Sequence, residues 1–353
     1  MSSSGEPAFA LSCPVPLADT DRVLLGHGSG GRMTADLIAR CFLPAFRNPY
    51  LEKLDDQAVL SVDGARLAFT TDSYVVTPLF FPGGDIGGLA LNGTVNDLAT
   101  AGARPLYLSA AFILEEGFPL ADLRRIVESM RSAAQAAGVL LVTGDTKVVD
   151  RGKADGCFVT TTGIGLLAHG GEISADRARP GDLVLLSGPI AEHGMAIMAA
   201  RAELELETPI VSDTAPLHEL VLAMLETGAR IHCLRDPTRG GVATALNEIA
   251  RRSGVGMVVE ESAVPVREPV RGVCEILGLD PLYVANEGKL LAIVAREDAP
   301  RLLERMRGRP EACEAEVIGE VVEDPSGLVV LKTRVGGRRI VDMLPGEQLP
   351  RIC

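Results

Sequence analysis

Hydrophobic and polar positions follow two different periods along the chain, and together they predict helices mixed with strands. Apolar residues that recur every three or four positions predict helices at 33–42, 85–101, 120–137, 193–202, 215–227, 242–253 and 298–307. Short apolar or alternating runs predict strands at 58–62, 67–71, 106–114, 139–143, 157–167, 183–187, 257–261, 289–295, 317–322 and 327–331. The run at 139–143 is typical of a buried strand. Since the strands are spaced irregularly, we expect an α+β fold with mixed β-sheets packed on helices rather than a doubly wound parallel sheet.

Composition divides the chain into five segments. Residues 1–21 are rich in serine and proline, and we expect a disordered extension there. Residues 22–50 hold a Gly-rich loop and a helix, residues 51–168 form a first domain, and residues 178–343 form a second α/β domain. Residues 344–353, with two prolines, a glycine and no period, are expected to be a flexible tail.

Charge and composition exclude several classes of protein. The 34 basic and 47 acidic residues give a net charge of −13, and the chain has no tryptophan, so we expect no nucleic-acid surface. The N-terminal residues lack a basic start followed by an apolar segment, and no apolar run is long enough to span a membrane. We therefore expect a cytoplasmic protein without a membrane segment. The seven cysteines show no C-x-x-C spacing, which argues against a disulfide framework or a structural zinc site.

The last residue, Cys353, places a thiol on the predicted tail. Most cysteines of the chain are expected to be buried, and only Cys353 has a sequence context that favours exposure. Ten extended residues span up to roughly 33 Å, so the tail could carry a nucleophile to a partner and back to a home site. The simpler alternative is a frayed chain end whose cysteine has no function.

The segment 26–31 is unusually rich in glycine. Gly26, Gly28 and Gly31 match the dinucleotide pattern G-x-G-x-x-G, and a predicted helix follows. The preceding strand would have at most four residues, so three interpretations stay open: a phosphate-contacting loop, the turn of a nicotinamide oxidoreductase, and a linker. The P-loop pattern G-x-x-x-x-G-K-[ST] does not occur in the sequence.

Acidic and amide side chains stand at the ends of predicted elements in the first domain. They are Asp55, Asp56, Asp72, Asn96, Asp97 and Asp145. Each one alone is explained by a turn or a helix cap. Several carboxylates that converge from different elements would instead bind Mg²⁺ and the phosphates of a nucleotide.

Two further segments combine acids with other functional groups. At 142–147 Asp145 and Lys147 lie two residues apart after a predicted strand, so both side chains emerge on the same face if that strand continues. Asp236 precedes a proline and a predicted helix, which is common for a capping residue, and the following Gly240 and Gly241 would let a ligand approach the backbone. The five histidines are scattered without metal spacing, so we expect surface or capping residues and no zinc hydrolase.

These segments together carry a family resemblance. It rests on GHGSGG at 26–31, Asp55-Asp56, Thr71-Asp72, NGTVNDLATAGARPL at 92–106, GDTKV at 144–148, DPTRGGV at 236–242, NEGK at 286–289 and PRIC at 350–353. From about residue 22 onward the chain resembles the HypE family of hydrogenase maturation factors. That family is part of the ATP-binding superfamily that includes aminoimidazole ribonucleotide synthetase, selenophosphate synthetase and thiamine-monophosphate kinase.

The resemblance implies an architecture and a reaction. The architecture is the two-domain aminoimidazole ribonucleotide synthetase-like fold, in a homodimer that pairs through the sheets of the N-terminal domains. ATP would bind near this interface, in the domain at 51–168, and the Gly-rich segment would close over it. The partner carbamoyltransferase HypF would carbamoylate Cys353, and ATP would drive dehydration of the S-carbamoyl group to S-cyanate. The cyano group would then pass to iron on the HypC-HypD complex, as a ligand of the NiFe hydrogenase centre.

The resemblance also implies roles for individual residues. The catalytic residues would be Cys353, Lys147, which orients the amide, and Glu287, the base matched to NEGK. The residues implied to bind ATP are Gly28, Gly30, Gly31, Asp56, Asn96, Asp97, Thr146 and Asp236. The residues implied to bind Mg²⁺ are Asp56, Asp72, Asp97 and Asp145.

Besides the nicotinamide oxidoreductase that would use Gly26 to Gly31, two other functions compete with this interpretation. Another kinase or synthetase of the superfamily is the nearer one, but selenophosphate synthetases place a reactive cysteine next to the Gly-rich segment, and Cys13 lies well upstream without that motif. A carrier without enzymatic activity that only presents Cys353 to its partners is the second alternative.

Overall fold

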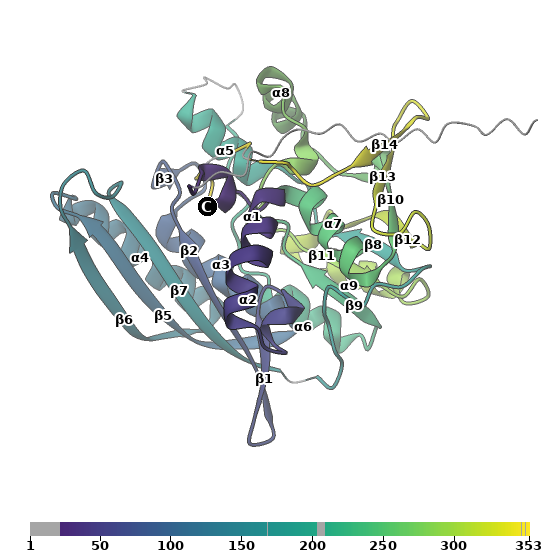
Figure 1. The fold of residues 1–353 in the computed structure, drawn as a ribbon, viewed down its shortest axis with the longest axis horizontal. Coiled ribbons are helices and arrows are strands. Elements are labelled where there is room, and N and C mark those ends of the chain that lie inside the picture. The colour runs from purple at the N-terminus through teal and green to yellow at the C-terminus, as the bar shows by residue number, and fades with distance from the viewer. Residues whose placement is uncertain (1–21, 168, 203–208, 347, 350) are drawn as a thin grey trace, which may run out of the picture.

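The computed structural model of the protein describes residues 22–167, 169–202, 209–346, 348–349 and 351–353. Two mixed sheets organise it, one of five strands in the N-terminal half and one of seven in the C-terminal half (Figure 1). Each contains one parallel pair, β5 with β6 and β10 with β13, among antiparallel pairs. The predicted α+β class is thereby confirmed. The extension predicted at 1–21 lies outside the described residues.

The N-terminal sheet is covered by helices on one face. Its strands, in spatial order, are β1 (Ala58–Val62), β2 (Ala65–Tyr74), β7 (Cys157–Leu167), β5 (Ala103–Glu115) and β6 (Leu140–Val149). The helices are α3 (Ile86–Thr100), which packs on β2, β5 and β7, and α4 (Leu120–Ala137), which packs on α3. A short hairpin of β3 (Phe80–Phe81) and β4 (Gly84–Asp85) precedes α3. This arrangement leaves the second face of the sheet without a helix among the described elements.

Strand β6 forms the outer edge of this sheet (Figure 1). Nine of its ten residues are exposed, including Leu140, Val142 and Val148. The prediction of a buried strand at 139–143 is therefore wrong. An apolar run indicates a strand, but it does not reveal whether another layer covers that strand, and β6 pairs only with β5 among the described strands.

The C-terminal sheet lies between two layers of helices. Its strands, in spatial order, are β14 (Arg338–Val341), β13 (Val329–Lys332), β10 (Gly256–Glu260), β12 (Glu316–Val322), β8 (Leu183–Leu186), β11 (Leu291–Val294) and β9 (Ile231–Arg235). Helices α5 (Glu192–Arg201), α7 (Gly241–Ser253) and α8 (Glu268–Leu277) contribute to one core, and α6 (His218–Glu226) and α9 (Ala299–Arg307) to the other. Alternate residues of β11 enter the two cores, which explains why its apolar run is continuous.

The first described segment lies between the two halves (Figure 1). It contains a 3₁₀ turn at Leu25–Gly28, α1 (Arg32–Leu37), a π-helical turn at Ile38–Phe42, α2 (Leu43–Phe46) and a 3₁₀ turn at Leu51–Lys53. The helix predicted at 33–42 is confirmed and continues to residue 46. None of the helices in the described ranges is long and apolar enough to cross a membrane.

Candidate functional site

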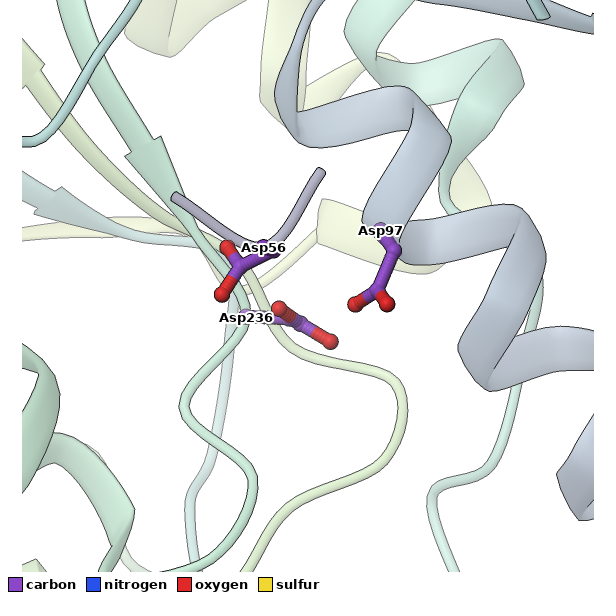
Figure 2. Close-up of side chains that lie close together, drawn as sticks. All are labelled: Asp56, Asp97 and Asp236. Atoms are coloured by element: carbon purple, nitrogen blue, oxygen red, sulfur yellow. The ribbon is translucent and has the colours of Figure 1, made fainter. Parts of the chain in front are cut away.

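Three aspartates converge between the two halves of the molecule (Figure 2). Asp97 lies on α3, Asp56 lies two residues before the start of β1, and Asp236 follows β9. Each offers a carboxylate oxygen that lies within 4.8 Å of the other two. The structure therefore brings together side chains that are up to 180 positions apart in the sequence (236 − 56 = 180).

Burial and mutual repulsion make these carboxyl groups weak acids. Desolvation is the main cause, and neighbouring carboxylates add to it, so the pKa of Asp56 is raised to about 8 and that of Asp236 to about 6. The pKa of Asp97 is raised for the same reasons. Arg235 opposes this effect, because its Nη1 lies 2.6 Å from Oδ1 of Asp56. The hydroxyl of Thr70 lies 2.8 Å from both Oδ2 of Asp97 and the carbonyl oxygen of Asp56.

This cluster has the chemistry of a hard-cation site. Carboxylate oxygens are the ligands that Mg²⁺ prefers, and a cation would relieve the repulsion that raises their pKa values. The cluster includes Asp56 and Asp97 of the predicted metal ligands, and Asp236, which was expected to contact ATP. Asp72 lies near enough to raise the pKa of Asp97. Asp55 is used elsewhere, since it accepts hydrogen bonds from Ser174 Oγ at 2.8 Å and from the backbone N–H of residue 175 at 3.0 Å.

The site residues predicted on β6 lie apart from this cluster in a single copy of the protein. Asp145 and Lys147 are exposed, and the Nζ atom of Lys147 lies 2.6 and 2.7 Å from the two carboxylate oxygens of Asp145. This interaction lowers the pKa of Asp145. Thr146, between them, is also exposed. Their predicted roles in binding ATP, Mg²⁺ and the amide stay predictions.

The Gly-rich segment separates two cavities. Gly30 and Gly31 line a pocket of about 730 Å³ that also contains Asp56, Thr70 and Arg235. Its walls carry apolar side chains from the first segment, among them Ile38, Phe42, Tyr50 and Leu54, and arginines 251 and 252. A mostly apolar pocket of this size with a charged end suits a nucleotide. Gly28 and Ser29 line the second cavity, of about 130 Å³, which contains Cys353.

Glycine is required at two positions of this segment. Gly30 has a φ of +77°, and a Cβ atom there would lie 2.8 Å from the Cβ of Arg239. A Cβ atom on Gly31 would lie 2.5 Å from the carbonyl oxygen of Leu344. The segment is followed by α1, but residues 22–24 before it form no strand. It is therefore not the strand–turn–helix of a dinucleotide fold.

The C-terminal tail is docked between the two halves rather than extended. The backbone N–H groups of Val75 and Thr77 donate to the carbonyl oxygens of Cys353 and Arg351, at 3.0 and 3.2 Å. From α5, the Nε2 atom of His193 lies 2.8 Å from the carbonyl oxygen of Ile352, and Arg201 donates to that of Arg351. Four hydrogen-bonding groups thus hold the backbone of three residues.

Side chains of the tail add further contacts. The guanidinium of Arg351 forms an ion pair with Asp155 and donates through Nε to the carbonyl oxygen of Val75 at 3.0 Å. Ile352 and Cys353 are buried in the core of the N-terminal half, with 3% and 9% exposure. The prediction that Cys353 is exposed is therefore wrong; the exposed cysteines among the described residues are Cys41 and Cys313. Backbone pairing buries the tail, and this pairing leaves no pattern in its sequence.

Glu287 lies beside the thiol of Cys353. Burial is the main cause that raises the pKa of each, and Glu287 is near enough to the thiol to raise the pKa of Cys353 further. Arg239 counteracts the shift at both groups. The sequence-based expectation of a carboxylate close to the sulfur is matched by this geometry, while the role of Glu287 as a base stays a prediction.

The backbone of Glu287 is fixed from both sides. Its N–H donates to Oδ1 of Asp213 at 3.1 Å, and its carbonyl oxygen accepts from Nδ2 of Asn96 at 3.2 Å. The second amide hydrogen of Asn96 goes to the carbonyl oxygen of residue 215 at 3.0 Å, and its Oδ1 accepts from the N–H of residue 217. Asn96, expected to bind ATP, thus uses both its donors within the chain and orients Glu287.

Asp236, in the loop after β9, does not cap the following helix, which was the simpler interpretation of its sequence position. The N-terminal cap of α7 is Gly240, and Asp236 belongs to the carboxylate cluster. Gly240 and Gly241 have φ values of +78° and +61°. Cβ atoms there would meet Thr244 at 2.2 Å and the carbonyl oxygen of Leu282 at 2.5 Å, so the space is filled by the protein itself. The positions of their missing side chains are therefore not open to a ligand, and the prediction that a ligand approaches the backbone here stays a prediction.

Three residues of the site were not predicted from the sequence. His193 is fully buried and contradicts the expectation of surface or capping histidines. Arg201 contacts the tail, and Arg239 contacts the Gly-rich segment. For Arg239, its place inside DPTRGG was a usable signal. For His193 and Arg201 no local pattern exists, because their partners lie about 150 residues further along the chain.

Comparisons with known proteins agree with this arrangement. Residues 54–167 match the family "AIR synthase related protein, N-terminal domain", and residues 179–332 match "AIR synthase related protein, C-terminal domain". Carbamoyl dehydratase HypE of Cupriavidus necator is 59% identical over 333 residues, which cover 94% of this chain and 95% of that protein.

Solved structures are also similar. One is described as a HypE-HypF complex; it has a TM-score of 0.83 and 51% identity, covering 87% of this chain and 99% of that one. Another, of hydrogenase maturation protein HypE in complex with ATP, has a TM-score of 0.80 and 51% identity, covering 94% and 100%.

Proposed function

Since the chain belongs to the carbamoyl dehydratase HypE family of AIR synthase related proteins, we propose that the two cavities and the docked tail together dehydrate an S-carbamoyl group on Cys353 to S-cyanate with ATP. The protein is an ATP-dependent carbamoyl dehydratase that acts in hydrogenase maturation. The observation that supports the site assignment is the position of the Cys353 thiol. The thiol lies beside Glu287, and only the Gly-rich segment separates its cavity from a pocket large enough for a nucleotide.

The chemistry explains why these elements are needed together. A carbamoyl oxygen is a poor leaving group, and transfer of the γ-phosphoryl group of ATP to this oxygen converts it into phosphate. In the first step a bond from the γ-phosphorus to ADP breaks, a C–O–P linkage forms, and the nitrogen loses one proton. In the second step the C–O bond breaks and phosphate leaves, the nitrogen loses its other proton, and the C≡N bond is completed. The sulfur of Cys353 keeps its bond to this carbon throughout.

Glu287 is placed to accept the protons from nitrogen. Its carboxyl group lies near enough to the Cys353 thiol to raise the pKa of that thiol, and its backbone is held by Asp213 and Asn96. A raised pKa makes its carboxylate a stronger base than an exposed glutamate. This role is supported by its position.

The carboxylate cluster fits a magnesium ion that accompanies the nucleotide. Asp56, Asp97 and Asp236 would hold the ion, with Asp72 nearby. When bound, Mg²⁺ neutralises charge on the phosphates of ATP during phosphoryl transfer. Asp56 lines the 730 Å³ pocket as well, so the cluster and the proposed nucleotide pocket adjoin. Gly30 and Gly31 are the glycines that would cover the nucleotide there, and Gly28 faces the thiol cavity.

We infer three protein partners. A similar solved structure is a complex with HypF, which supports this carbamoyltransferase as the partner that modifies Cys353. Because Cys353 is buried when docked, the tail must leave its site to be carbamoylated and again to deliver its cyano group to the HypC-HypD complex. The third partner is a second copy of the chain. The uncovered face and the exposed edge strand β6 of the N-terminal sheet support a homodimer in which Asp145, Thr146 and Lys147 approach the neighbouring copy. A cytoplasmic location stays a prediction.

Mass spectrometry of the C-terminal peptide tests the proposed function. The protein is incubated with HypF under carbamoylating conditions, with and without Mg-ATP. We expect a carbamoyl mass on Cys353 that loses one water only when Mg-ATP is present. Carbamoylation without loss of water would leave a thiol carrier. An unmodified Cys353, in an incubation where HypF is active, would assign the cavities to another ATP-dependent reaction of the superfamily.

A further inference from the structure

Arg239 contacts both the Gly-rich segment and the thiol cavity. It lies in the loop between β9 and α7 and lines the cavity of Cys353. Its Nη1 donates to the carbonyl oxygen of Gly28 at 3.2 Å, and its Nη2 lies 3.9 Å from Oδ1 of Asp72. The side chain is 42% exposed, so its guanidinium is open to an incoming group.

The backbone around Arg239 fixes its position. Gly240 and Gly241 turn the chain through left-handed conformations against Thr244 and Leu282. On the other side Gly30 contacts the stem of Arg239 so closely that a Cβ on Gly30 would lie 2.8 Å from the Cβ of Arg239. Because Gly30 lines the larger pocket, Arg239 stands at the boundary between the proposed nucleotide pocket and the thiol.

Negative side chains surround the thiol cavity, so an anionic group that enters it needs a nearby positive charge. Asp72 and Glu287 both act on Cys353 as negative charges, and Arg239 is the positive charge that acts on both Cys353 and Glu287. The other cations near the tail have partners: Arg201 donates to backbone carbonyls and Arg351 pairs with Asp155. An anionic phosphoryl group that enters a cavity with these carboxylates would be repelled without a positive charge.

We propose that Arg239 is a catalytic residue that binds the oxygens of the phosphoryl group as it passes from ATP to the carbamoyl oxygen on Cys353. This inference rests on the proposed function and names the residue that makes its first step possible. Arg239 keeps its protons: it donates hydrogen bonds to the non-bridging oxygens while the bond to ADP breaks and the bond to the carbamoyl oxygen forms. A planar guanidinium presents paired donors that match these oxygens, which a lysine does only as a point charge.

The experiment separates carbamoylation from dehydration. Wild-type protein, Arg239→Ala and Arg239→Lys are first carbamoylated with HypF, then mixed with Mg-ATP, and the loss of water from the C-terminal peptide is followed by mass spectrometry. We expect normal carbamoylation in all three, a rate of water loss about 10²–10³-fold lower in Arg239→Ala, and partial activity in Arg239→Lys. Guanidinium ion at a non-denaturing concentration should restore part of the activity of Arg239→Ala. Arg131→Ala, which removes an exposed ion pair on α4, serves as the control and should behave as wild type.

The outcomes discriminate between three explanations. Water loss at the wild-type rate in Arg239→Ala would overturn the proposal and leave the proposed function intact. Equal loss of activity in Arg239→Ala and Arg239→Lys, with no restoration by guanidinium, would assign Arg239 to holding the Gly-rich segment and would also overturn it. Failure of the carbamoylated wild-type protein to lose water would overturn the proposed function and this inference with it.

Discussion

The Nε2 atom of His193 lies 2.8 Å from the carbonyl oxygen of Ile352, so that one side chain of α5 holds the peptide next to Cys353. The other ring nitrogen, Nδ1, lies 2.7 Å from the hydroxyl of Ser212. A neutral imidazole has one donor and one acceptor. With Nε2 donating to the carbonyl, Nδ1 accepts from Ser212, and burial favours this neutral form by lowering the pKa of His193.

The docked tail should protect Cys353 from alkylation. Thiolates react with iodoacetamide, and burial both blocks access and raises the pKa of Cys353. At pH 8 we expect the exposed Cys41 and Cys313 to be labelled about tenfold faster than Cys353 or more. His193→Ala removes one hydrogen bond to the tail, which contributes roughly 1 kcal/mol, so labelling of Cys353 should accelerate by about fivefold. Peptide mass spectrometry over time measures these rates. His218→Ala, which alters another buried histidine, should leave the rate at Cys353 unchanged; equal labelling of Cys353 and Cys313 in the wild type would contradict a docked tail.

Acid should release the tail through His193. Its pKa in the folded protein is below the ordinary value of 6.5, so docking is favoured above that value and weakens as the pH falls through the lowered pKa. Burial, to which the docked tail contributes, is the largest cause of this lowering. Arg201 adds to it, whereas Asp213 and the hydrogen bond to Ile352 raise the pKa and oppose it. The reactivity of Cys353 towards dithiodipyridine, which reacts with thiols in acid, should therefore increase below pH 6.5 relative to that of Cys313. In His193→Gln, whose amide does not titrate, this increase should disappear; a persistent increase would point to other groups.

Replacement of Glu287 should separate the two modifications of Cys353. Glu287→Gln keeps the shape of the side chain but cannot accept a proton from nitrogen, so we expect carbamoylation to continue and dehydration to fall by about 10²–10⁴-fold. Single-turnover mass spectrometry with Mg-ATP reports both. Glu304→Gln on the surface of α9 is the matched control. Normal conversion to S-cyanate in Glu287→Gln would assign the base to another residue.

Removal of one carboxylate should stabilise the metal-free protein while abolishing its response to Mg²⁺. The pKa of Asp97 is raised in the folded state, so its ionised form costs stability as the pH rises above the unfolded value. At pH 8, Asp97→Asn should raise the free energy of unfolding by about 1 kcal/mol, because asparagine carries no charge. Thermal unfolding with and without MgCl₂ should show a stabilised wild type and an unresponsive variant. An equal shift by Mg²⁺ in both proteins would place the ion elsewhere.

The edge strand β6 should be needed for dimer formation. Val142 is an exposed apolar residue of this strand, and a lysine there would place a charge in a paired interface. We expect Val142→Lys to shift the protein from dimer to monomer in light scattering, with loss of the activity to which Lys147 contributes. Val335→Lys, at the 94% exposed tip between β13 and β14, is the control and should remain dimeric. A monomeric wild type would exclude the dimer.

Most of the fold could be predicted from the sequence where local periodicity determines structure. The predicted helix at 120–137 and strands at 58–62 and 157–167 have the bounds found for α4, β1 and β7. The two-residue strands β3 and β4 were missed, and three longer elements were missed for local reasons. Strand β9 (Ile231–Arg235) is short and holds a histidine and an arginine, α8 (Glu268–Leu277) contains a proline and a glycine, and β14 (Arg338–Val341) has two arginines. Tertiary packing overrides these weak propensities.

The site was predictable only where residue types carry the chemistry. The carboxylates Asp56 and Asp97 and the pair Glu287 and Cys353 follow from acids and a thiol at recognisable motifs. The docking of the tail could not be predicted from the sequence. Its hydrogen bonds involve backbone groups of Val75 and Thr77, which any sequence supplies. Such contacts depend on three-dimensional proximity alone.

The carboxylate cluster draws its members from both halves of the chain, Asp56 and Asp97 from the first and Asp236 from the second. Neither half by itself therefore contains all three carboxylates of the proposed cation site. If the chain were divided in the linker near residue 178 and the two fragments produced separately, tight binding of a divalent ion would appear only after they reassociate. Cation affinity would then serve as a complementation assay for assembly of the two halves, independent of any catalytic turnover.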